Sequence, residues 1–219
     1  MDFSSAQFKN RWVAYFDLLG FSNMASSNSD FGRQLVLDTY AEVIEKLKGV
    51  SKEASEHSAP VRSVWFSDSF LMYTPGDTPL EYRAIISAAK RFIEKQIWAG
   101  IPACGIIGFG ELFAHSEKNV FIGNVLCDVV RLEQNLHSVG LFMSNAAGEK
   151  AKSYNLHPTR HGFQPMGEKG LAYTFCRGSA NFRNPCLSKL EGMQRLAPPA
   201  AKDKYADVIK HIEKFARKI

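Results

Sequence analysis

The sequence lacks the features that would place it in a membrane or in the secretory pathway. Its 219 residues contain no apolar run of the about 18 residues that a membrane-spanning helix needs. The first residues lack the basic segment and the apolar stretch of a secretory signal. We therefore expect a cytoplasmic protein with no direct membrane insertion.

The cysteines lack the spacing of a zinc site. Cys104, Cys127, Cys176 and Cys186 form no C-x2-C pair, the arrangement that structural zinc sites use. Disulfides are rare in cytosolic proteins. The sequence therefore predicts reduced thiols that hold no metal.

Common catalytic and nucleotide-binding patterns are missing as well. The sequence has no Gly-x-Ser-x-Gly elbow and no P-loop. Gly105, Gly108 and Gly110 are not followed by a helix, which a dinucleotide-binding fingerprint requires. The aromatic residues lie on apolar faces and the net charge is only +5, so we expect no nucleic-acid partner.

What the chain does contain is typical of a globular domain, with 45% apolar and 22% charged residues. Apolar runs and helical spacing predict alternating strands and helices. The predicted strands span residues 11–17, 61–66, 70–73, 141–144, 164–166 and 171–176, with a strand hairpin over 101–113. The predicted helices span 30–48, 79–99, 121–136, 145–154 and 202–219, and 49–60 is predicted as a surface loop.

This order of elements predicts an α+β fold, with one antiparallel-rich sheet and helices packed on one of its faces. Residues 177–199 are rich in Asn, Arg and Pro, which marks a change in composition. We therefore predict one domain over residues 1–195. A C-terminal amphipathic helix within 196–219 would pack on that domain or on a dimer partner.

Two short segments place an aspartate at the end of an apolar, strand-like run. Asp17 lies in residues 15–21 and Asp68 in residues 64–70. A carboxylate at the end of a buried strand is unfavourable unless a cation meets it. Two such carboxylates in one domain predict a shared divalent-metal site. The alternative is that each is a cap or turn residue, since Asp68 between two serines would be an ordinary turn former.

Leu19, Gly20 and Phe21 follow Asp17 at a predicted strand-to-turn junction. Backbone N–H groups at such a junction can bind phosphate oxygens. Gly20 would permit a positive φ or the close approach of a ligand. A plain tight turn explains the same residues.

Four segments, in order along the chain, resemble motifs of the class III nucleotidyl cyclases. Residues 16–21 resemble the first metal motif, and residues 67–72 are similar to the second. Residues 123–133 resemble the helix that carries the transition-state arginine, and residues 169–175 resemble the late Lys-Gly-x-x-x-Thr strand.

The resemblance implies a ferredoxin-like class III cyclase catalytic domain that acts as a homodimer with two shared sites. It implies metal ligation by Asp17, Leu18 and Asp68, with two Mg²⁺ or Mn²⁺ ions per site. It also implies that Arg131 and Lys169 are the catalytic cations and that they come from the partner subunit.

Each of these two cations has an ordinary alternative role. Arg131 could pair with Asp128 or Glu133 on a solvated helix face. Lys169 could be a solvated turn lysine, because the phosphate-binding lysine of the family often lies two positions earlier, where this chain has Gly167.

Three positions depart from the pattern of the purine cyclases. Val64 and Val120 stand where those enzymes read the base, and Cys127 stands where they orient the ribose. These side chains cannot make the usual hydrogen bonds to adenine. Short cyclases with altered base readers resemble the bacterial pyrimidine cyclases of the Pycsar anti-phage systems.

This second resemblance implies a substrate and a partner. The Pycsar cyclases make cyclic UMP or cyclic CMP as a signal for a separate effector protein. For this chain the resemblance implies UTP as substrate, with CTP as the alternative. Two further hypotheses stay open, namely a purine cyclase and a catalytically inactive nucleotide-sensing module.

Overall fold

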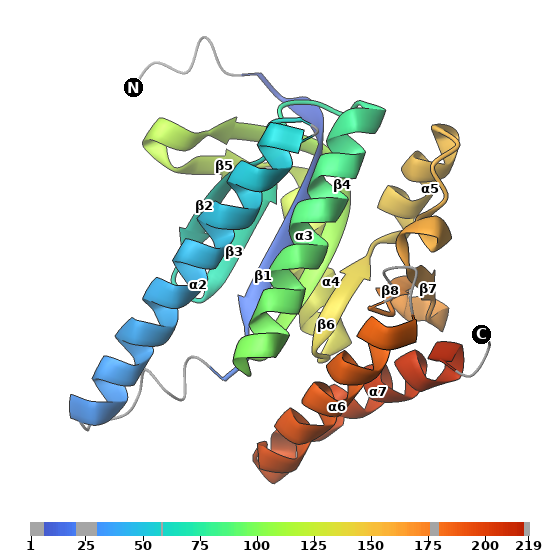
Figure 1. Cartoon of the computed structure of the whole chain (residues 1–219). Helices are drawn as coiled ribbons and strands as arrows, with labels where there is room; N and C mark the ends of the chain where they lie inside the picture. Colours follow the sequence, from blue (N-terminus) through green and yellow to red (C-terminus); the bar gives the residue numbers. More distant parts are fainter. Residues whose placement is uncertain (1–6, 21–29, 58, 176–179, 217–219) are drawn as a thin grey trace.

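The structure is a computed structural model, and it describes residues 7–20, 30–57, 59–175 and 180–216. One sheet runs through the molecule with helices packed against it (Figure 1). The strands are β1 (Lys9–Leu18), β2 (Arg62–Phe66), β3 (Ser69–Tyr73), β4 (Ala103–His115), β5 (Val120–Ile122), β6 (Gly140–Met143), β7 (Phe163–Pro165) and β8 (Leu171–Tyr173). The helices are α2 (Asp30–His57), α3 (Pro79–Ala99), α4 (Asn124–Leu136), α5 (Asn145–Ser153), α6 (Ala180–Leu196) and α7 (Asp203–Ala216).

The strands follow the order β2-β3-β1-β4-β6-β8-β7, and β5 pairs with β4 outside this path. The central pair, β1 and β4, is antiparallel from Lys9 opposite Leu112 to Leu18 opposite Ala103. Strands β4 and β6 run parallel, and α4 lies in the connection between them. The sheet is therefore mostly antiparallel, which confirms the predicted α+β fold.

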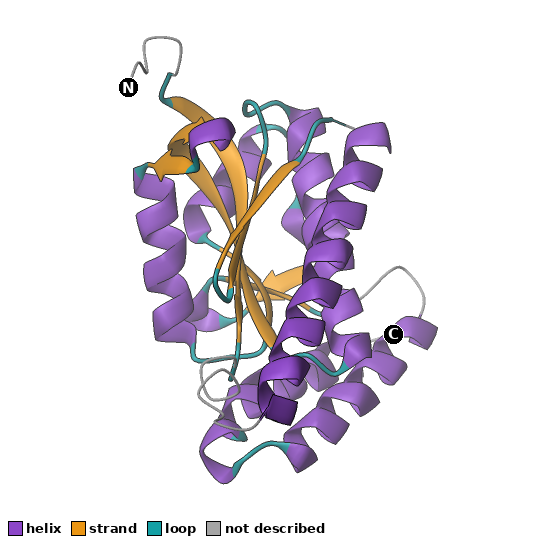
Figure 2. Ribbon diagram, turned by 90° about the vertical axis from the view of Figure 1, so that its left-hand side faces the viewer, coloured by secondary structure: helices purple, strands orange, loops and turns teal. Residues whose placement is uncertain are grey.

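Helices cover both faces of the sheet, so the predicted single helical face is wrong. Helix α4 covers one face, and Figure 2 shows it apart from the other helices. Helices α2, α3, α5, α6 and α7 pack on the other face. The reason lies in the apolar run of β1. Its Val13 points into the core under α4, whereas Phe16 points into the other core, so both faces need cover.

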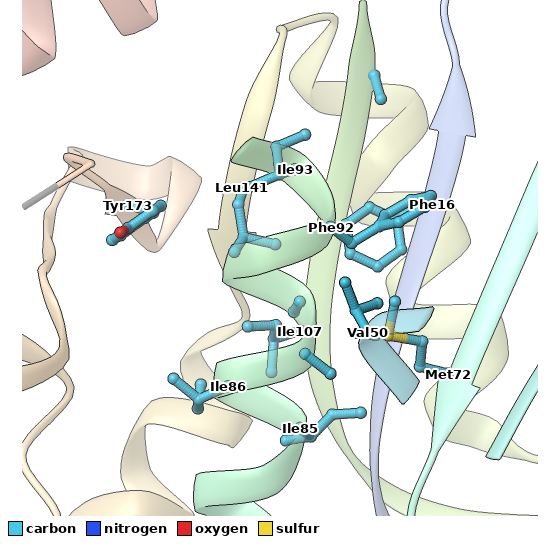
Figure 3. Packing of buried hydrophobic residues seen from close by; sticks show 14 of the residues in the cluster. Phe16, Val50, Met72, Ile85, Ile86, Phe92, Ile93, Ile107, Leu141 and Tyr173 are labelled. Atoms are coloured by element: carbon cyan, nitrogen blue, oxygen red, sulfur yellow. The ribbon is translucent and has the colours of Figure 1, made fainter. Parts of the chain in front are cut away.

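Figure 3 shows part of the larger core, in which α3 lies across the central strands. The rings of Phe16 in β1 and Phe92 in α3 meet edge to face, with centroids 4.7 Å apart. Aromatic pairs of this geometry contribute beyond their buried area. This packing fixes the end of β1 that carries Asp17.

The ends of α3 follow from its sequence. The Thr78 side chain accepts a hydrogen bond from the Glu81 backbone, and Glu81 reaches back to the Thr78 N–H at 2.7 Å. Gly100 then ends the helix with a φ of 78°. Capping boxes and left-handed glycines stabilise helix ends in this way. The predicted bounds of this helix are confirmed.

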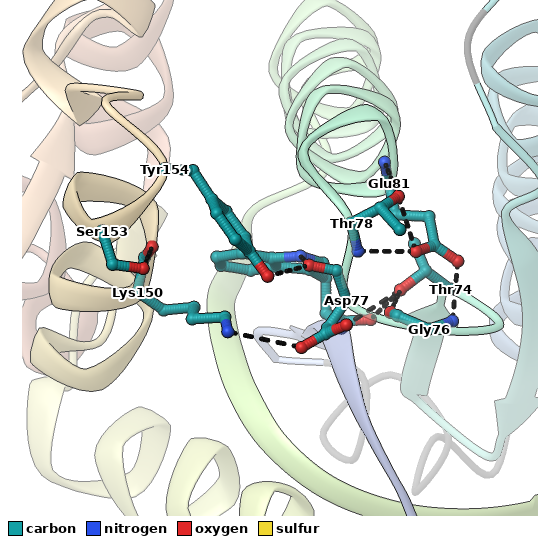
Figure 4. Close-up of polar contacts among 9 residues, drawn as sticks. Thr74, Gly76, Asp77, Thr78, Glu81, Lys150, Ser153 and Tyr154 are labelled. Atoms are coloured by element: carbon teal, nitrogen blue, oxygen red, sulfur yellow. Dashed lines mark hydrogen bonds and ion pairs between the residues drawn. The ribbon is translucent and has the colours of Figure 1, made fainter.

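A polar network after β3 holds α3 and α5 together (Figure 4). Lys150 of α5 lies 3.3 Å from a carboxylate oxygen of Asp77. The Tyr154 hydroxyl donates to the Asp77 carbonyl at 2.7 Å. Because β3 begins at Ser69 and ends at Tyr73, this network lies at the opposite end of the strand from Asp68.

Two predictions for residues 49–113 are wrong. Helix α2 continues to His57, where a loop from residue 49 was expected, because Val50 and Ala54 extend its buried stripe. Residues 103–115 form one strand rather than a hairpin. Its glycines serve close packing instead of a turn, since a Cβ atom on Gly108 would lie 2.4 Å from Cγ1 of Val129.

The second half of the chain brings further corrections. Helix α4 begins at Asn124 rather than at residue 121, because residues 120–122 pair with β4 as β5. Helix α6, for which no helix was predicted, occupies most of the segment rich in Asn, Arg and Pro, with Pro185 inside it. The predicted C-terminal helix is confirmed as α7, and its Tyr205, Val208 and Ile212 are buried against the chain's own core.

Two expectations about composition can be compared with the described residues. Cys104, Cys127 and Cys186 are free thiols, as predicted, and Cys176 lies outside the described residues. Among those residues, no helix combines the length and apolar composition that a membrane-spanning segment requires.

Candidate active site

The two predicted metal aspartates lie at the same end of adjacent strands. Strands β1 and β3 are antiparallel, with Asp17 opposite Ser69. The tight turn between β2 and β3 therefore lies beside the last residues of β1. The Leu18 N–H donates to the Asp68 carbonyl at 3.0 Å, which ties the two segments together.

A short chain of hydrogen bonds orients the Asp17 carboxylate. The Ser69 hydroxyl donates to Oδ1 of Asp17 at 3.3 Å, and the Tyr15 hydroxyl lies 2.8 Å from the same serine oxygen. Burial raises the pKa of Tyr15 to about 12, so this hydroxyl keeps its proton. The Asp17 side chain is thus held in place before any ligand binds.

The electrostatics of Asp17 favour a cation. Burial, followed by the carboxylates of Glu133 and Asp68, raises the pKa of Asp17 to about 6. The Ser69 hydrogen bond and the charge of Lys204 oppose this increase. Burial likewise raises the pKa of Glu133, although Lys204 lowers it. Negative charge therefore accumulates at this edge of the sheet.

These residues fit a divalent metal held by few protein ligands. In the described part of the chain, no three or more His, Cys, Asp and Glu side chains form a group that could hold a metal ion. Mg²⁺ is commonly bound through one or two carboxylates together with substrate phosphates and water. Asp17 and Asp68 match that pattern. Leu18 has a hydrocarbon side chain without a ligand atom, so this buried residue could offer an ion only its carbonyl oxygen.

The turn after Asp17 is the segment that was predicted to bind phosphate. Gly20 has a φ of +82°, and no atom lies within 4 Å of the position of a Cβ, so the turn requires glycine for its backbone conformation. The Leu19 N–H already donates to the Pro102 carbonyl at 2.9 Å. It is therefore not available to a phosphate in this conformation. Phe21 lies outside the described residues.

Arg131 projects from the solvent-facing side of α4. Its side chain is 76% exposed and lies 3.9 Å from the Asp128 carboxylate, which is the ordinary pairing on a solvated helix face. Close docking positions the helix: a Cβ on Gly123 would lie 2.2 Å from the Glu111 carbonyl oxygen, and Asn124 accepts from the Glu111 N–H at 3.1 Å. The Gly-Asn pair thus fixes the start of α4 on β4.

Lys169 lies in a short turn (Gly167–Lys169) between β7 and β8. Its ammonium group is 2.5 Å from the Asp207 carboxylate of α7, beside a pocket of about 920 Å³. The charges that shift the pKa of Asp17 come from Glu133, Asp68 and Lys204, and Lys169 and Arg131 are not among them. Among the described residues, neither cation forms a salt bridge with Asp17 or Asp68.

The three positions expected near the base lie on three different elements. Val64 is in β2, Val120 begins β5, and Cys127 is exposed on α4. Strands β2 and β5 approach each other here, since the rings of Phe66 and Phe121 are 5.7 Å apart. This surface offers apolar and aromatic groups where hydrogen-bonding side chains were expected in a purine cyclase.

Comparison with known proteins rests on structure alone, because no protein-family model and no curated protein matches the chain. The adenylyl cyclase CyaB from P. aeruginosa has a TM-score of 0.52 at 13% identity, over 68% of this chain and 83% of that chain. The guanylate cyclase domain of RhGC from Catenaria anguillulae, solved with GTP, has a TM-score of 0.54 at 17% identity, over 75% of this chain and 93% of that chain. The chain has the class III cyclase fold.

A third structure with this fold aligns with more of the chain. It is a class III adenylyl cyclase-like ATP-binding protein from Pseudomonas aeruginosa, with a TM-score of 0.53 at 12% identity. The alignment covers 97% of this chain and 44% of that protein. At such low sequence identity, the structural similarity shows the fold of the chain. Its activity has to be argued from its own residues.

Sequence reasoning missed three residues whose hydrogen bond or charge acts on Asp17. Ser69 was read only as part of a turn, although its place beside Asp68 already put it next to the site. Glu133 was considered only as a partner for Arg131, whereas its charge acts on Asp17. Lys204 gave no local signal, because it reaches the site only through the packing of α7.

Proposed function

We propose that the protein is a nucleotide cyclase that converts a pyrimidine nucleoside triphosphate, UTP or alternatively CTP, to its 3′,5′-cyclic monophosphate and pyrophosphate. The observation that carries this proposal is the pair Asp17 and Asp68 at one sheet edge, crowded with negative charge, in a class III cyclase fold. The similar solved structures that are named as cyclases support the reaction class.

The roles of the residues follow from the charge changes in the reaction. The ribose 3′-oxygen attacks the α-phosphorus, a new O–P bond forms, and pyrophosphate leaves with the bonding electrons of the broken bond. Asp17 and Asp68 would hold Mg²⁺ or Mn²⁺, whose charge assists loss of the 3′-hydroxyl proton and offsets the phosphate charge. Ser69 keeps Asp17 oriented for this task.

The proposal includes a homodimer, because neither of the two remaining cations forms a salt bridge with the aspartates of its own chain in the described residues. In the shared sites, Arg131 of a second copy would stabilise charge that develops on the α-phosphoryl group. Lys169 of that copy would bind the terminal phosphates. The exposure of Arg131 supports such a role across an interface.

Pyrimidine specificity rests on Val64, Val120 and Cys127, which supply no side-chain amide, carboxylate or ammonium group to read a purine. Selectivity of this kind depends on matching every buried polar group of the base. An anti-phage role, with a separate effector that responds to the cyclic nucleotide, follows only from the resemblance to the Pycsar cyclases. We include that role in the proposal, together with a cytoplasmic location.

The decisive experiment incubates the purified chain with ATP, GTP, CTP or UTP and Mn²⁺, followed by separation of the products. We expect cyclic UMP as the main product, or cyclic CMP. A purine cyclic nucleotide as the main product would overturn the pyrimidine assignment and keep the reaction. Asp68→Asn should abolish every cyclic product.

A nucleotide-binding module without catalysis is the second candidate. The structure that aligns with 97% of this chain is named an ATP-binding protein that is cyclase-like, which favours this second candidate. Tight nucleotide binding without pyrophosphate release, measured for all four triphosphates, would establish it. Retention of Asp17, Asp68 and Arg131 together in one chain argues for the catalytic proposal.

A further inference from the structure

A pocket lies between the end of β1 and the C-terminal helices. Its volume is about 580 Å³, within the range of small-molecule sites. Leu19 and Gly20 line one side, and Lys189 of α6 and Lys204 of α7 line the other. Because Leu19 is two residues from Asp17 in the sequence, the pocket adjoins the candidate metal site.

The lining of the pocket carries positive charge and no negative charge. None of its lining residues is acidic, whereas two are lysines. Within the described part of the chain, neither lysine forms a salt bridge. This differs from Lys169, whose ammonium group already pairs with Asp207. The lysines of this pocket thus remain available to an anion.

The main chain around Lys204 is firmly held. Its carbonyl accepts from the Val139 N–H at 2.8 Å and from the Ser138 hydroxyl at 3.1 Å, which anchors the start of α7 beside β6. Lys189 lies near the C-terminal end of α3, where its Nζ is 4.0 Å from the position of a Cβ on Gly100. The negative end of a helix dipole favours a cation there. Lys204 thus comes from an anchored backbone position, and the Lys189 ammonium group lies at the end of α3.

We propose that Lys189 and Lys204 bind the terminal phosphates of the substrate, and later the pyrophosphate product, in the same subunit that provides Asp17. This inference rests on the proposed function and assigns a phosphate-binding role to α6 and α7. The triphosphate would extend from the metal site along Leu19 and Gly20 to the two lysines. The charge of Lys204, which acts on Asp17 and Glu133, supports this placement.

The test measures binding of pyrophosphate by titration calorimetry and turnover with the triphosphate that the wild-type protein prefers. The variants are Lys189→Gln, Lys204→Gln and the control Lys202→Gln. Lys202 is exposed in the same C-terminal segment and does not line the pocket, so its substitution removes the same charge without the proposed contact. Lys204→Arg tests retention of a cation, and thermal melts check that each variant folds.

We expect the two pocket variants to bind pyrophosphate on the order of tenfold more weakly and to raise KM by a similar factor. Lys202→Gln should stay within about twofold of wild type, and Lys204→Arg should recover most of the binding. Pocket variants that bind pyrophosphate as well as Lys202→Gln does would overturn the inference, even if the enzyme is a cyclase. Lysine-dependent pyrophosphate binding without cyclic product from any triphosphate would instead overturn the proposed function alone.

Discussion

At the scale of single residues, the Asp17 carboxylate is oriented for a ligand, and its ionised form is unfavourable without a bound cation. Ser69 holds its carboxylate, while burial and two neighbouring carboxylates oppose its ionisation. Groups with perturbed pKa values of this kind cluster at functional sites. The same features predict a change of stability with pH.

We expect Asp17→Asn to stabilise the metal-free protein while it abolishes activity. The folded-state pKa of about 6 lies above the ordinary value of 3.8, so the folded protein binds this proton more tightly than the unfolded chain does. The free energy of unfolding of the wild type should therefore fall as the pH rises from about 4 to about 6. Above that range, asparagine avoids the cost of the buried charge.

Thermal melts in the presence of a chelator measure this effect. At about pH 8, Asp17→Asn should be more stable by about 1 kcal/mol, a value reduced to allow for solvent screening at a half-buried site. At about pH 4 the two proteins should melt alike. Mn²⁺ should stabilise only the wild type, and Asp38→Asn on the exposed side of α2 should change nothing. A variant that melts lower than wild type at about pH 8 would contradict this account.

The sequence draws attention to the two aspartates and not to the groups around them. Asp17 and Asp68 were recognisable because each ends an apolar run, and a carboxylate there needs a reason. Glu133 and Lys204 could not be placed, because their approach depends on how α4 and α7 cross the sheet. Long-range packing of this kind leaves no local pattern in the sequence.

At the scale of elements, the glycines of β4 show why some predicted elements were wrong. Gly105, Gly108 and Gly110 interrupt a long apolar segment, and this pattern suggested a hairpin. In the fold, Gly108 instead lets Val129 of α4 pack directly on the strand. By contrast, α3 was predicted with its correct bounds. The residues that begin and end it, from Thr78 and Pro79 to Gly100, lie next to the helix in the sequence.

Gly108→Ala should destabilise the protein by about 1–3 kcal/mol, because the added methyl group would overlap with Val129. Since α4 carries Arg131, activity should fall as well. Gly192→Ala is the matched control in α6, where the nearest atom is 3.8 Å away. It should stabilise the helix by up to about 1 kcal/mol. Chemical denaturation distinguishes the two, and equal effects would refute the close-packing explanation.

Helix α7 also restrains one of the proposed catalytic cations. Asp207 pairs with Lys169 in the structure, so a phosphate must compete with this carboxylate. Asp207→Asn should therefore lower KM for the triphosphate by about twofold to fivefold. Its effect on stability should stay below about 1 kcal/mol, since the pair is largely solvent-accessible.

Steady-state kinetics test this restraint, with Glu213→Gln as the control because Glu213 lines the same pocket on α7. The control should leave KM unchanged. Loss of activity in Asp207→Asn would mean that the ion pair positions Lys169 rather than restrains it.

At the scale of the whole molecule, the proposed catalytic groups lie on different elements of one chain. The aspartates lie at the edge formed by β1 and the β2–β3 turn, whereas Arg131 faces solvent on α4. Exposed apolar side chains flank both places: Trp65 and Phe66 end β2 just before the β2–β3 turn, and Ile122 ends β5 just before α4. An interface there would cover apolar surface and bring an arginine to the aspartates of the other copy.

Complementation between two inactive variants tests this arrangement. Asp68→Ala and Arg131→Ala should each be inactive alone, because each removes one group from both shared sites. In a mixed dimer, one site lacks both groups and the other is intact. If subunits exchange at random in an equal mixture, half of the dimers are mixed, so activity should recover to about a quarter of the wild-type value.

The matched control mixes Asp68→Ala with Asp17→Ala. Both changes fall in the same half of the site, so every site in the mixed dimer still lacks one aspartate and no activity should return. Recovery in this control would show that product comes from something other than shared sites. Absence of recovery in the first mixture, with mixed dimers shown to form, would place Arg131 outside the reaction and confine catalysis to one chain.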